Sequence, residues 1–309
     1  MSAALAIPAC TQQNAEAGPS GYNVLLITLD TTRADHLSCY GYDKNTSPNL
    51  DALAADGVLF EMAISTASVT PISHASILTG LNPYHHGLRV FYGPTGHFLT
   101  DEFPSLATIL KKHGWQTGAF ISAYPASERF GLHWGFDTFE SDVADKVMTR
   151  DPSKPLPKDG FCQNIPTASA QRRADPTTDQ ALGWLKKAHR PFFSWLHYFD
   201  PHDPSLVPPN KFIKQFGIKI NEKITTETLY DPEIFFMDLH IGRVIEYLKK
   251  TGEYDSTIII AIGDHGQGMG QHNWFSHRLL YQEQIRLPFI MRIPDGARGI
   301  KITELVRSI

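Results

Sequence analysis

The chain has 309 residues, of which 42% are hydrophobic and 19% are charged, and its formal net charge is −4. This length and hydrophobic content suffice for one large α/β domain or for two smaller domains. The small negative charge, without a basic stripe, excludes an electrostatic surface for nucleic acid. No run of roughly 18 or more apolar residues is present, which excludes a membrane-spanning helix in this sequence.

The cysteines and the N-terminal residues bear on the compartment of the protein. Three cysteines, Cys10, Cys39 and Cys162, are too few for a disulfide framework, and no pair has the spacing of zinc ligands. Cys10 ends a short apolar stretch, which resembles the end of a bacterial lipoprotein signal, although the positive start and most of the apolar core are absent. Residues 1–21 are therefore either the remnant of such a signal with a flexible tether or an ordinary disordered N-terminus. We favour an exported protein, in the periplasm or at the cell surface, with a lipid anchor at Cys10.

From Tyr22 onward the pattern alternates between strands and helices. In chain order we expect a strand at 23–29, a helix at 48–56, a strand at 58–60, a helix that begins near Thr70, a helix at 103–112, a strand at 117–121, a surface excursion at 141–173, a helix at 175–187, a strand at 192–199, a helix at 232–250, and strands at 256–262 and 287–291. Several of these strands are short and continuously apolar, which is typical of strands buried on both faces. The predicted fold is α/β, with a mostly parallel sheet and helices on both faces.

Two of the expected strands end at carboxylates. The strand at 23–29 leads into Asp30, and the strand at 256–262 leads into Gly263, Asp264 and His265. Ligands of open α/β sheets collect at the carboxyl ends of the strands, and two carboxylates with an imidazole suit a divalent cation. The alternative is that each aspartate caps the helix or turn that follows its strand. That alternative is favoured for either aspartate alone, whereas the pair together with His265 predicts a metal site.

The helix that begins near Thr70 has Pro71 at its first position, which is typical of a first helical turn. Thr70 either caps this helix or presents its hydroxyl at the helix N-terminus, where free backbone donors favour an oxyanion. Beside a metal ion, such a hydroxyl could ionise and attack an ester.

These segments resemble, in their order along the chain, the sulfatase family within the alkaline phosphatase superfamily. The matching segments, which together span 22 to about 305, are 29–37, 39–42, 47–51, 70–80, 82–87, 199–202, 230–231 with Asp238, and 263–266. The resemblance implies an alkaline-phosphatase-like fold, with the catalytic domain at 22–309. It also implies further chain that forms a smaller C-terminal subdomain, so we expect a truncated domain with an exposed apolar edge that promotes association.

The resemblance assigns roles by position. It implies that Asp30, Asp264 and His265 are metal ligands, and it places Thr70 at the nucleophile position, which also touches the metal. The nucleophile would then attack the ester from beside the cation.

Further histidines match or approach substrate-binding positions of the family. His202 matches a histidine that contacts the sulfate or phosphate group of the substrate. His277 lies near the position of a substrate-binding lysine, with an exposed loop histidine as an equal alternative, and His74 replaces an arginine of the sulfatase motif and is taken as a third substrate-binding candidate. His197, Asp200 and His202 could instead begin a second metal site, but their spacing does not match the two-metal pattern of the superfamily.

The sequence also departs from the sulfatase pattern. Sulfatases form a formylglycine from cysteine or serine, whereas Thr70 carries a β-methyl group, so no formylglycine is expected. Ile72 replaces the proline of the motif, and Thr31 stands where a second aspartate is common. Residues 121–124 lack a lysine and a histidine of the usual sulfate pocket. These departures leave both sulfate esters and phosphate esters as candidate substrates.

The remaining residues resemble the single-metal branch of the superfamily, which uses a threonine. We predict a metal-dependent hydrolase of sulfate or phosphate esters of small molecules or glycans, with a phosphotransferase or a catalytically silent sulfatase-like protein as alternatives. The nitrogen of His265 favours Mn²⁺ or Zn²⁺, with Ca²⁺ as a third candidate.

Overall fold

The computed structural model describes residues 21–91, 95–143, 171–202, 206–219 and 225–309. The expected N-terminal tether with Cys10 and most of the expected excursion at 141–173 lie outside these ranges. Within the described ranges, no helix is long and apolar enough to cross a membrane.

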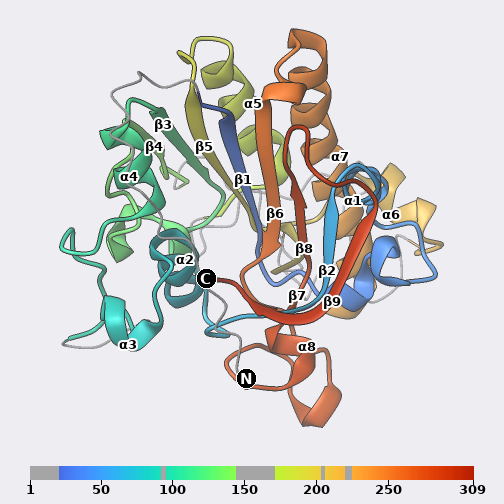
Figure 1. The fold of residues 1–309 in the computed structure, drawn as a ribbon. Helices are drawn as coiled ribbons and strands as arrows, with labels where there is room; N and C mark the ends of the chain where they lie inside the picture. The colour runs from blue at the N-terminus through green and yellow to red at the C-terminus, as the bar shows by residue number, and fades with distance from the viewer. Residues whose placement is uncertain (1–20, 92–94, 144–170, 203–205, 220–224) are drawn as a thin grey trace, which may run out of the picture.

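One mixed sheet of nine strands runs through the part of the chain that the structure describes (Figure 1). The strands are β1 (Asn23–Leu29), β2 (Val58–Ile64), β3 (Gln116–Ile121), β4 (Thr138–Glu140), β5 (Phe192–Tyr198), β6 (Thr257–Gly263), β7 (Arg286–Leu287), β8 (Phe289–Arg292) and β9 (Ile300–Arg307). Their order is β4-β3-β5-β1-β6-β8-β2-β7, and β9 also pairs with β2. The strands from β4 to β6 in this order are parallel, whereas β7 and β8 are antiparallel to their neighbours. The predicted mostly parallel sheet is confirmed.

Helices cover both faces of the sheet (Figure 1). The α-helices are α1 (Pro48–Ala55), α2 (Thr70–Thr79), α3 (Pro83–His86), α4 (Leu106–Lys112), α5 (Ala174–Leu185), α6 (Asn210–Gln215), α7 (Thr226–Thr251) and α8 (Gln282–Ile285). Short 3-10 helices lie at Ala34–His36, Ser38–Tyr40, Tyr124–Ala126, Glu128–Phe130, Asp200–His202, Tyr254–Ser256 and Gln271–Asn273. Leu25 and Ile27 of β1 pack in one core with residues of α1, α5 and α7, and Leu26 packs in another with residues of α2 and α4. Because successive strand residues point to opposite faces, β1 contributes to two cores, and its residues from Val24 to Ile27 are all apolar.

The main differences from the sequence prediction lie at element boundaries. α7 begins at Thr226 rather than at Pro232, because Thr225 and Thr228 form a capping box and Pro232 is accommodated inside the helix. The strand expected at 287–291 is divided into β7 and β8 at Pro288, which has no backbone N–H to donate to a neighbouring strand.

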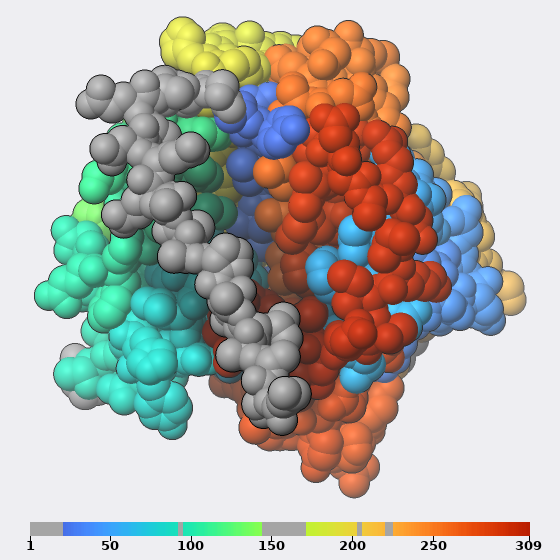
Figure 2. Space-filling model, in the orientation of Figure 1, coloured from blue at the N-terminus to red at the C-terminus, as the bar shows by residue number. Residues whose placement is uncertain are grey.

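β9 forms an edge of the sheet beside β2. Ile300 and Leu305 of this strand are 45% and 66% exposed. In Figure 2 the red C-terminal residues lie at the surface next to light-blue residues of the β2 region. The association expected of an exposed apolar edge stays a prediction.

Two helical glycines form a matched pair that tests this packing. A Cβ on Gly242 of α7 would lie 2.5 Å from Cγ of Asn49 in α1, whereas a Cβ on Gly183 of α5 would meet nothing within 4 Å. We expect Gly183→Ala to raise the free energy of unfolding by about 0.5–1 kcal/mol, since alanine loses less backbone entropy in a helix. We expect Gly242→Ala to lower it by about 1–3 kcal/mol, because the methyl group displaces the Asn49 side chain, which hydrogen-bonds to Asp238 of α7. Urea unfolding measures both values, and stabilisation by both variants would contradict the close approach of the two helices.

Candidate active site

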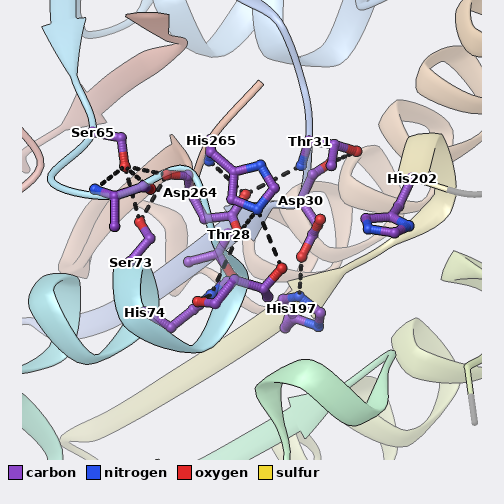
Figure 3. A network of polar contacts seen from close by, with 12 residues as sticks. Thr28, Asp30, Thr31, Ser65, Ser73, His74, His197, His202, Asp264 and His265 are labelled. Carbon is purple, nitrogen blue, oxygen red and sulfur yellow. Dashed lines mark hydrogen bonds and ion pairs between the residues drawn. The ribbon is translucent and has the colours of Figure 1, made fainter. Parts of the chain in front are cut away.

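The two aspartates that follow β1 and β6 lie side by side. The strands are parallel neighbours in which Leu29 pairs with Gly263, so Asp30 and Asp264 leave the sheet at the same edge. Ligand atoms of Asp30, Asp264 and His265 lie within 4.8 Å of one another, and all three residues are buried. Their side chains converge in Figure 3, and we call them the Asp–Asp–His cluster.

Each aspartate of the cluster has one carboxylate oxygen held by the protein and one left open. Oδ1 of Asp264 accepts hydrogen bonds from the backbone N–H groups of Thr31 (3.2 Å) and His265 (2.7 Å). Oδ2 of Asp30 lies 3.2 Å from Nε2 of His197. Within the described residues, Oδ1 of Asp30 and Oδ2 of Asp264 are buried without a hydrogen-bond partner. Orphaned buried acceptors are costly, and a cation between them would satisfy both.

His265 presents the lone pair of a ring nitrogen to the same point. Its Nδ1 lies 3.0 Å from the carbonyl oxygen of Gly266, so this nitrogen carries the hydrogen and donates it. Its Nε2 keeps a lone pair and lies 3.2 Å from Oγ1 of Thr70. This is the tautomer that a metal ligand needs.

The structure excludes the alternative that Thr70 caps α2. Val69 is the N-cap residue, Thr70 is the first helical residue, and no side chain makes a cap hydrogen bond. The hydroxyl of Thr70 faces the Asp–Asp–His cluster instead. α2 is fixed against β6 by Ser73, whose hydroxyl donates to the carbonyl oxygen of Asp264 (2.7 Å), and Ser65 donates to the same oxygen (2.6 Å).

The turn after Asp30 is strained and is held by α7. Thr31 has a φ of 49°, which is unusual for a β-branched residue. Tyr230 of α7 donates its hydroxyl hydrogen to the carbonyl oxygen of Thr31 (2.6 Å) and accepts from the backbone N–H of Arg33 (2.9 Å). The Thr31 hydroxyl donates to the carbonyl oxygen of Asp30 (2.8 Å), so it is not presented to the cluster as a ligand.

His74 lies behind Thr70 and is fully buried. Its Nδ1 donates to the carbonyl oxygen of Thr70 (2.8 Å), and its Nε2 lies 3.0 Å from Oγ1 of Thr28. Trp195 donates its indole N–H to that same hydroxyl (3.0 Å), which therefore donates its own hydrogen to His74. Both ring nitrogens of His74 are occupied within the protein, so the expected substrate contact has no open nitrogen to make it.

The structure brings His202 and His277 together beside the cluster. Their Nε2 atoms lie 3.3 Å apart. Nδ1 of His277 donates to the carbonyl oxygen of Ser68 (2.9 Å), so Nε2 of His277 accepts and Nε2 of His202 donates. The ring of His277 also stacks on that of His265, with centroids 4.3 Å apart. Because His277 is 8% exposed, the alternative of an exposed loop histidine does not apply.

The second metal site considered from the sequence is not assembled. His197 contacts Asp30, and Asp200 accepts a hydrogen bond from the backbone N–H of Ala174 (3.0 Å). Across the described ranges, the Asp–Asp–His cluster is the one group of three such side chains close enough to share an ion.

Burial gives the site unusual ionisation. Burial raises the pKa of Asp30, and burial together with the charge of Asp30 raises the pKa of Asp264. Burial lowers the pKa of His265, His197 and His277 to about 3 in each case. These three histidines are therefore neutral at pH 7. The raised pKa values of Asp30 and Asp264 favour a proton bound to one of the two carboxylates. A divalent cation fits this donor set, because it would neutralise both carboxylates and use the lone pair of His265.

One contact of the site is not expected from the sequence. The sequence predicts that His197 lies inside a strand, with a second metal site as the alternative. β5 confirms the strand, and the bond of His197 to Asp30 adds a residue to the site. A histidine within an apolar strand indicates that its ring nitrogens need buried hydrogen-bond partners. Which residue is the partner depends on which strand lies next to it in the sheet.

Comparison with known proteins places the chain in a family. A family model for sulfatases matches residues 22–309. The chain belongs to the sulfatase family. It is 25% identical over 350 residues to an arylsulfatase of Clostridium perfringens, covering 92% of this chain and 72% of that protein. It is 24% identical to an N-acetylglucosamine-6-O-sulfatase of Bacteroides thetaiotaomicron, covering 96% of this chain and 67% of that protein.

Solved structures show the same fold. The phosphonate monoester hydrolase of Agrobacterium radiobacter superposes with a TM-score of 0.69 at 19% identity, covering 93% of this chain and 71% of that chain. A protein solved in complex with its substrate D-glucosamine-2-N,6-O-disulfate superposes with a TM-score of 0.66 at 18% identity, covering 94% of this chain and 74% of that chain. The alkaline-phosphatase-like fold implied by the sequence is thereby confirmed.

We expect Asp264→Asn to stabilise the metal-free protein, increasingly so as the pH rises. The raised pKa values of Asp30 and Asp264 mean that the folded state keeps protons that the unfolded chain releases above about pH 4. The stability contribution of this pair therefore falls as the pH rises, whereas asparagine does not titrate. Urea unfolding in excess chelator should show the advantage of the variant growing by about 1 kcal/mol or more between pH 5 and pH 8.

The comparison of Asp264→Asn with the wild type contains its own control. The buried histidines titrate alike in both proteins, so their contributions cancel in the difference. In saturating Mn²⁺ the order should reverse, because the variant lacks one ligand. A difference that does not change with pH would contradict the coupling of the two carboxylates.

Proposed function

We propose that the protein hydrolyses sulfate esters of small molecules or glycans, with Thr70 as the nucleophile and one divalent cation held by Asp30, Asp264 and His265. The observation that carries this proposal is the convergence of a hydroxyl at a helix N-terminus, two open carboxylate oxygens and an imidazole nitrogen that keeps its lone pair. Membership of the sulfatase family, and relatives named arylsulfatase and N-acetylglucosamine-6-O-sulfatase, support sulfate as the group that is cleaved. The catalytic domain would comprise residues 22–309.

The chemistry requires two displacements at sulfur. The cation, when bound, would polarise a non-bridging oxygen of the ester and lower the pKa of the Thr70 hydroxyl. Oγ1 of Thr70 forms a bond to sulfur, the bond between sulfur and the alcohol oxygen breaks, and the alcohol leaves with the proton that Thr70 loses. Water then attacks the sulfur of the sulfated threonine, which restores the hydroxyl and releases hydrogen sulfate. The N-terminal end of α2 stabilises the negative charge at Thr70.

The histidine pair beside the cluster would orient the ester. His202 carries the donor hydrogen on Nε2, so we assign it to a non-bridging oxygen of the sulfate group. Nε2 of His277 keeps a lone pair, because Ser68 fixes the ring hydrogen on Nδ1. In the structure this lone pair accepts the hydrogen of His202, so the substrate would take the place of the bond between the two histidines. That lone pair suits a hydroxyl group of the substrate, such as a sugar hydroxyl.

Substitutions of Thr70 test the nucleophile. We expect Thr70→Ala to lower kcat for 4-nitrophenyl sulfate by about 1,000-fold or more, as the loss of a catalytic nucleophile does elsewhere. Thr70→Ser keeps the hydroxyl and should retain turnover, and digestion of the quenched reaction should yield a sulfated peptide at this position. The wild-type peptide should carry unmodified Thr70 and no formylglycine.

The same assay distinguishes a sulfate-ester hydrolase from a phosphate-ester hydrolase and from a catalytically silent protein. 4-Nitrophenyl phosphate and bis(4-nitrophenyl) phosphate run beside the sulfate report phosphate-ester activity. Turnover of a phosphate ester without turnover of the sulfate would redirect the proposal to phosphate. Unchanged turnover in Thr70→Ala would remove this residue as the nucleophile, and a metal-loaded protein that turns over none of the three esters would be a silent member of the family.

We propose Mn²⁺ or Zn²⁺ as the resident cation. The protein offers two single carboxylate oxygens, one imidazole nitrogen and the Thr70 hydroxyl, which is few oxygen donors for Ca²⁺ and a set that suits the smaller, nitrogen-binding ions. After chelation, we expect Mn²⁺ or Zn²⁺ to restore turnover and raise the melting temperature at concentrations about 10-fold or more below those needed for Ca²⁺. Equal potency of Ca²⁺ would contradict the inferred donor set.

We also propose that the protein is exported and carries a lipid on Cys10. The apolar stretch that ends at Cys10 and the polar stretch after it support this proposal. Lipid-specific metabolic labelling of the wild type and of Cys10→Ser tests it, and equal labelling of both would contradict it.

A further inference from the structure

We infer that His197 is a positioning residue that orients Asp30 for the cation. This inference rests on the metal site of the proposed function and adds a residue outside the ligand set. His197 lies in β5, next to β1, and pairs in register with Thr28, two residues before Asp30. It is fully buried, and its Nε2 lies 3.2 Å from Oδ2 of Asp30 (Figure 3).

The hydrogen bonds of His197 define its tautomer. The backbone N–H of Ser122, just after β3, lies 3.3 Å from Nδ1 of His197 and can only donate. Nδ1 therefore keeps its lone pair, and the ring hydrogen lies on Nε2, directed at Oδ2 of Asp30. The chain from Ser122 to His197 to Asp30 runs across β3, β5 and β1, so the donor is carried by the rigid centre of the sheet.

This donor determines which oxygen of Asp30 is available. With Oδ2 held by His197, Oδ1 is the oxygen left open to the cluster. Asp264 is arranged in the same way, with Oδ1 held by two backbone N–H groups and Oδ2 open. The torsion that turns a carboxylate is broad, so Asp30 without its donor would lose this orientation. Hydrogen-bond partners of metal ligands typically change metal affinity by about 10–100-fold.

A structural histidine elsewhere in the chain provides a matched control. His86 is also buried, its Nδ1 accepts from the backbone N–H of Leu88 (3.2 Å), and its Nε2 lies 3.0 Å from Oγ of Ser76. The arrangement repeats that of His197, but the contacted oxygen belongs to a serine in the second half of α2. Loss of His86 should therefore cost stability without changing the metal site.

The test measures Mn²⁺ affinity by calorimetry in the absence of substrate. We expect His197→Ala and His197→Asn to weaken Mn²⁺ binding by about 10–100-fold. Asparagine can still accept from Ser122 but is too short to donate to Asp30, whereas glutamine places an amide N–H near the position of Nε2. We therefore expect His197→Gln to bind within about 10-fold of the wild type. His86→Ala should bind Mn²⁺ as the wild type does, even where it lowers the melting temperature.

The Mn²⁺ affinities of these variants distinguish a positioning role of His197 from a purely structural one. Wild-type affinity in folded His197→Asn, or an equal loss in His86→Ala, would overturn the positioning role. If His197→Ala does not fold, the asparagine and glutamine variants still decide, because they differ in the donor to Asp30. A protein that shows these affinities but hydrolyses no ester would refute the proposed function and leave the role of His197 intact.

Discussion

Two carboxylates held side by side in the protein interior are the constraint on which the rest of the site depends. The parallel pairing of β1 with β6 brings Asp30 and Asp264 to one point, and burial raises the pKa of both. Neither can move away, because each follows directly from a central strand. The surrounding donors do not neutralise the pair; they fix one oxygen of each carboxylate and leave the other open. A cation bound between the two open oxygens would release the free energy stored in that arrangement.

The supporting elements fix the pair from different directions. Ser73 ties the start of α2 to the backbone of Asp264, which sets the position of Thr70. Tyr230 holds the strained turn at Thr31 from α7. Hydroxyl groups make these contacts, and they adapt to either a donor or an acceptor without adding charge. These hydroxyl contacts therefore hold the two aspartates in place without placing a further charge between them.

Local sequence patterns encode only part of this site. Continuous apolar runs predict β1 and β6, and the rule that parallel strands end at one edge suffices to bring Asp30, Asp264 and His265 together. The same patterns misplace the cap of α2 and the start of α7, because cap positions depend on hydrogen bonds that composition does not specify. The contact of His197 with Asp30 depends on β5 lying beside β1, and strand order is a property of the whole chain.

The charge of the centre also bears on which esters it accepts. The histidines that contact the Asp–Asp–His cluster are neutral, since burial lowers the pKa of His197, His265 and His277 to about 3. A divalent cation held between the two carboxylates would balance their charge. A sulfate monoester and a phosphodiester each bring one negative charge, whereas a phosphate monoester brings close to two at neutral pH. Each further charge buried without a counterion is costly, so we expect such a centre to favour monoanionic esters.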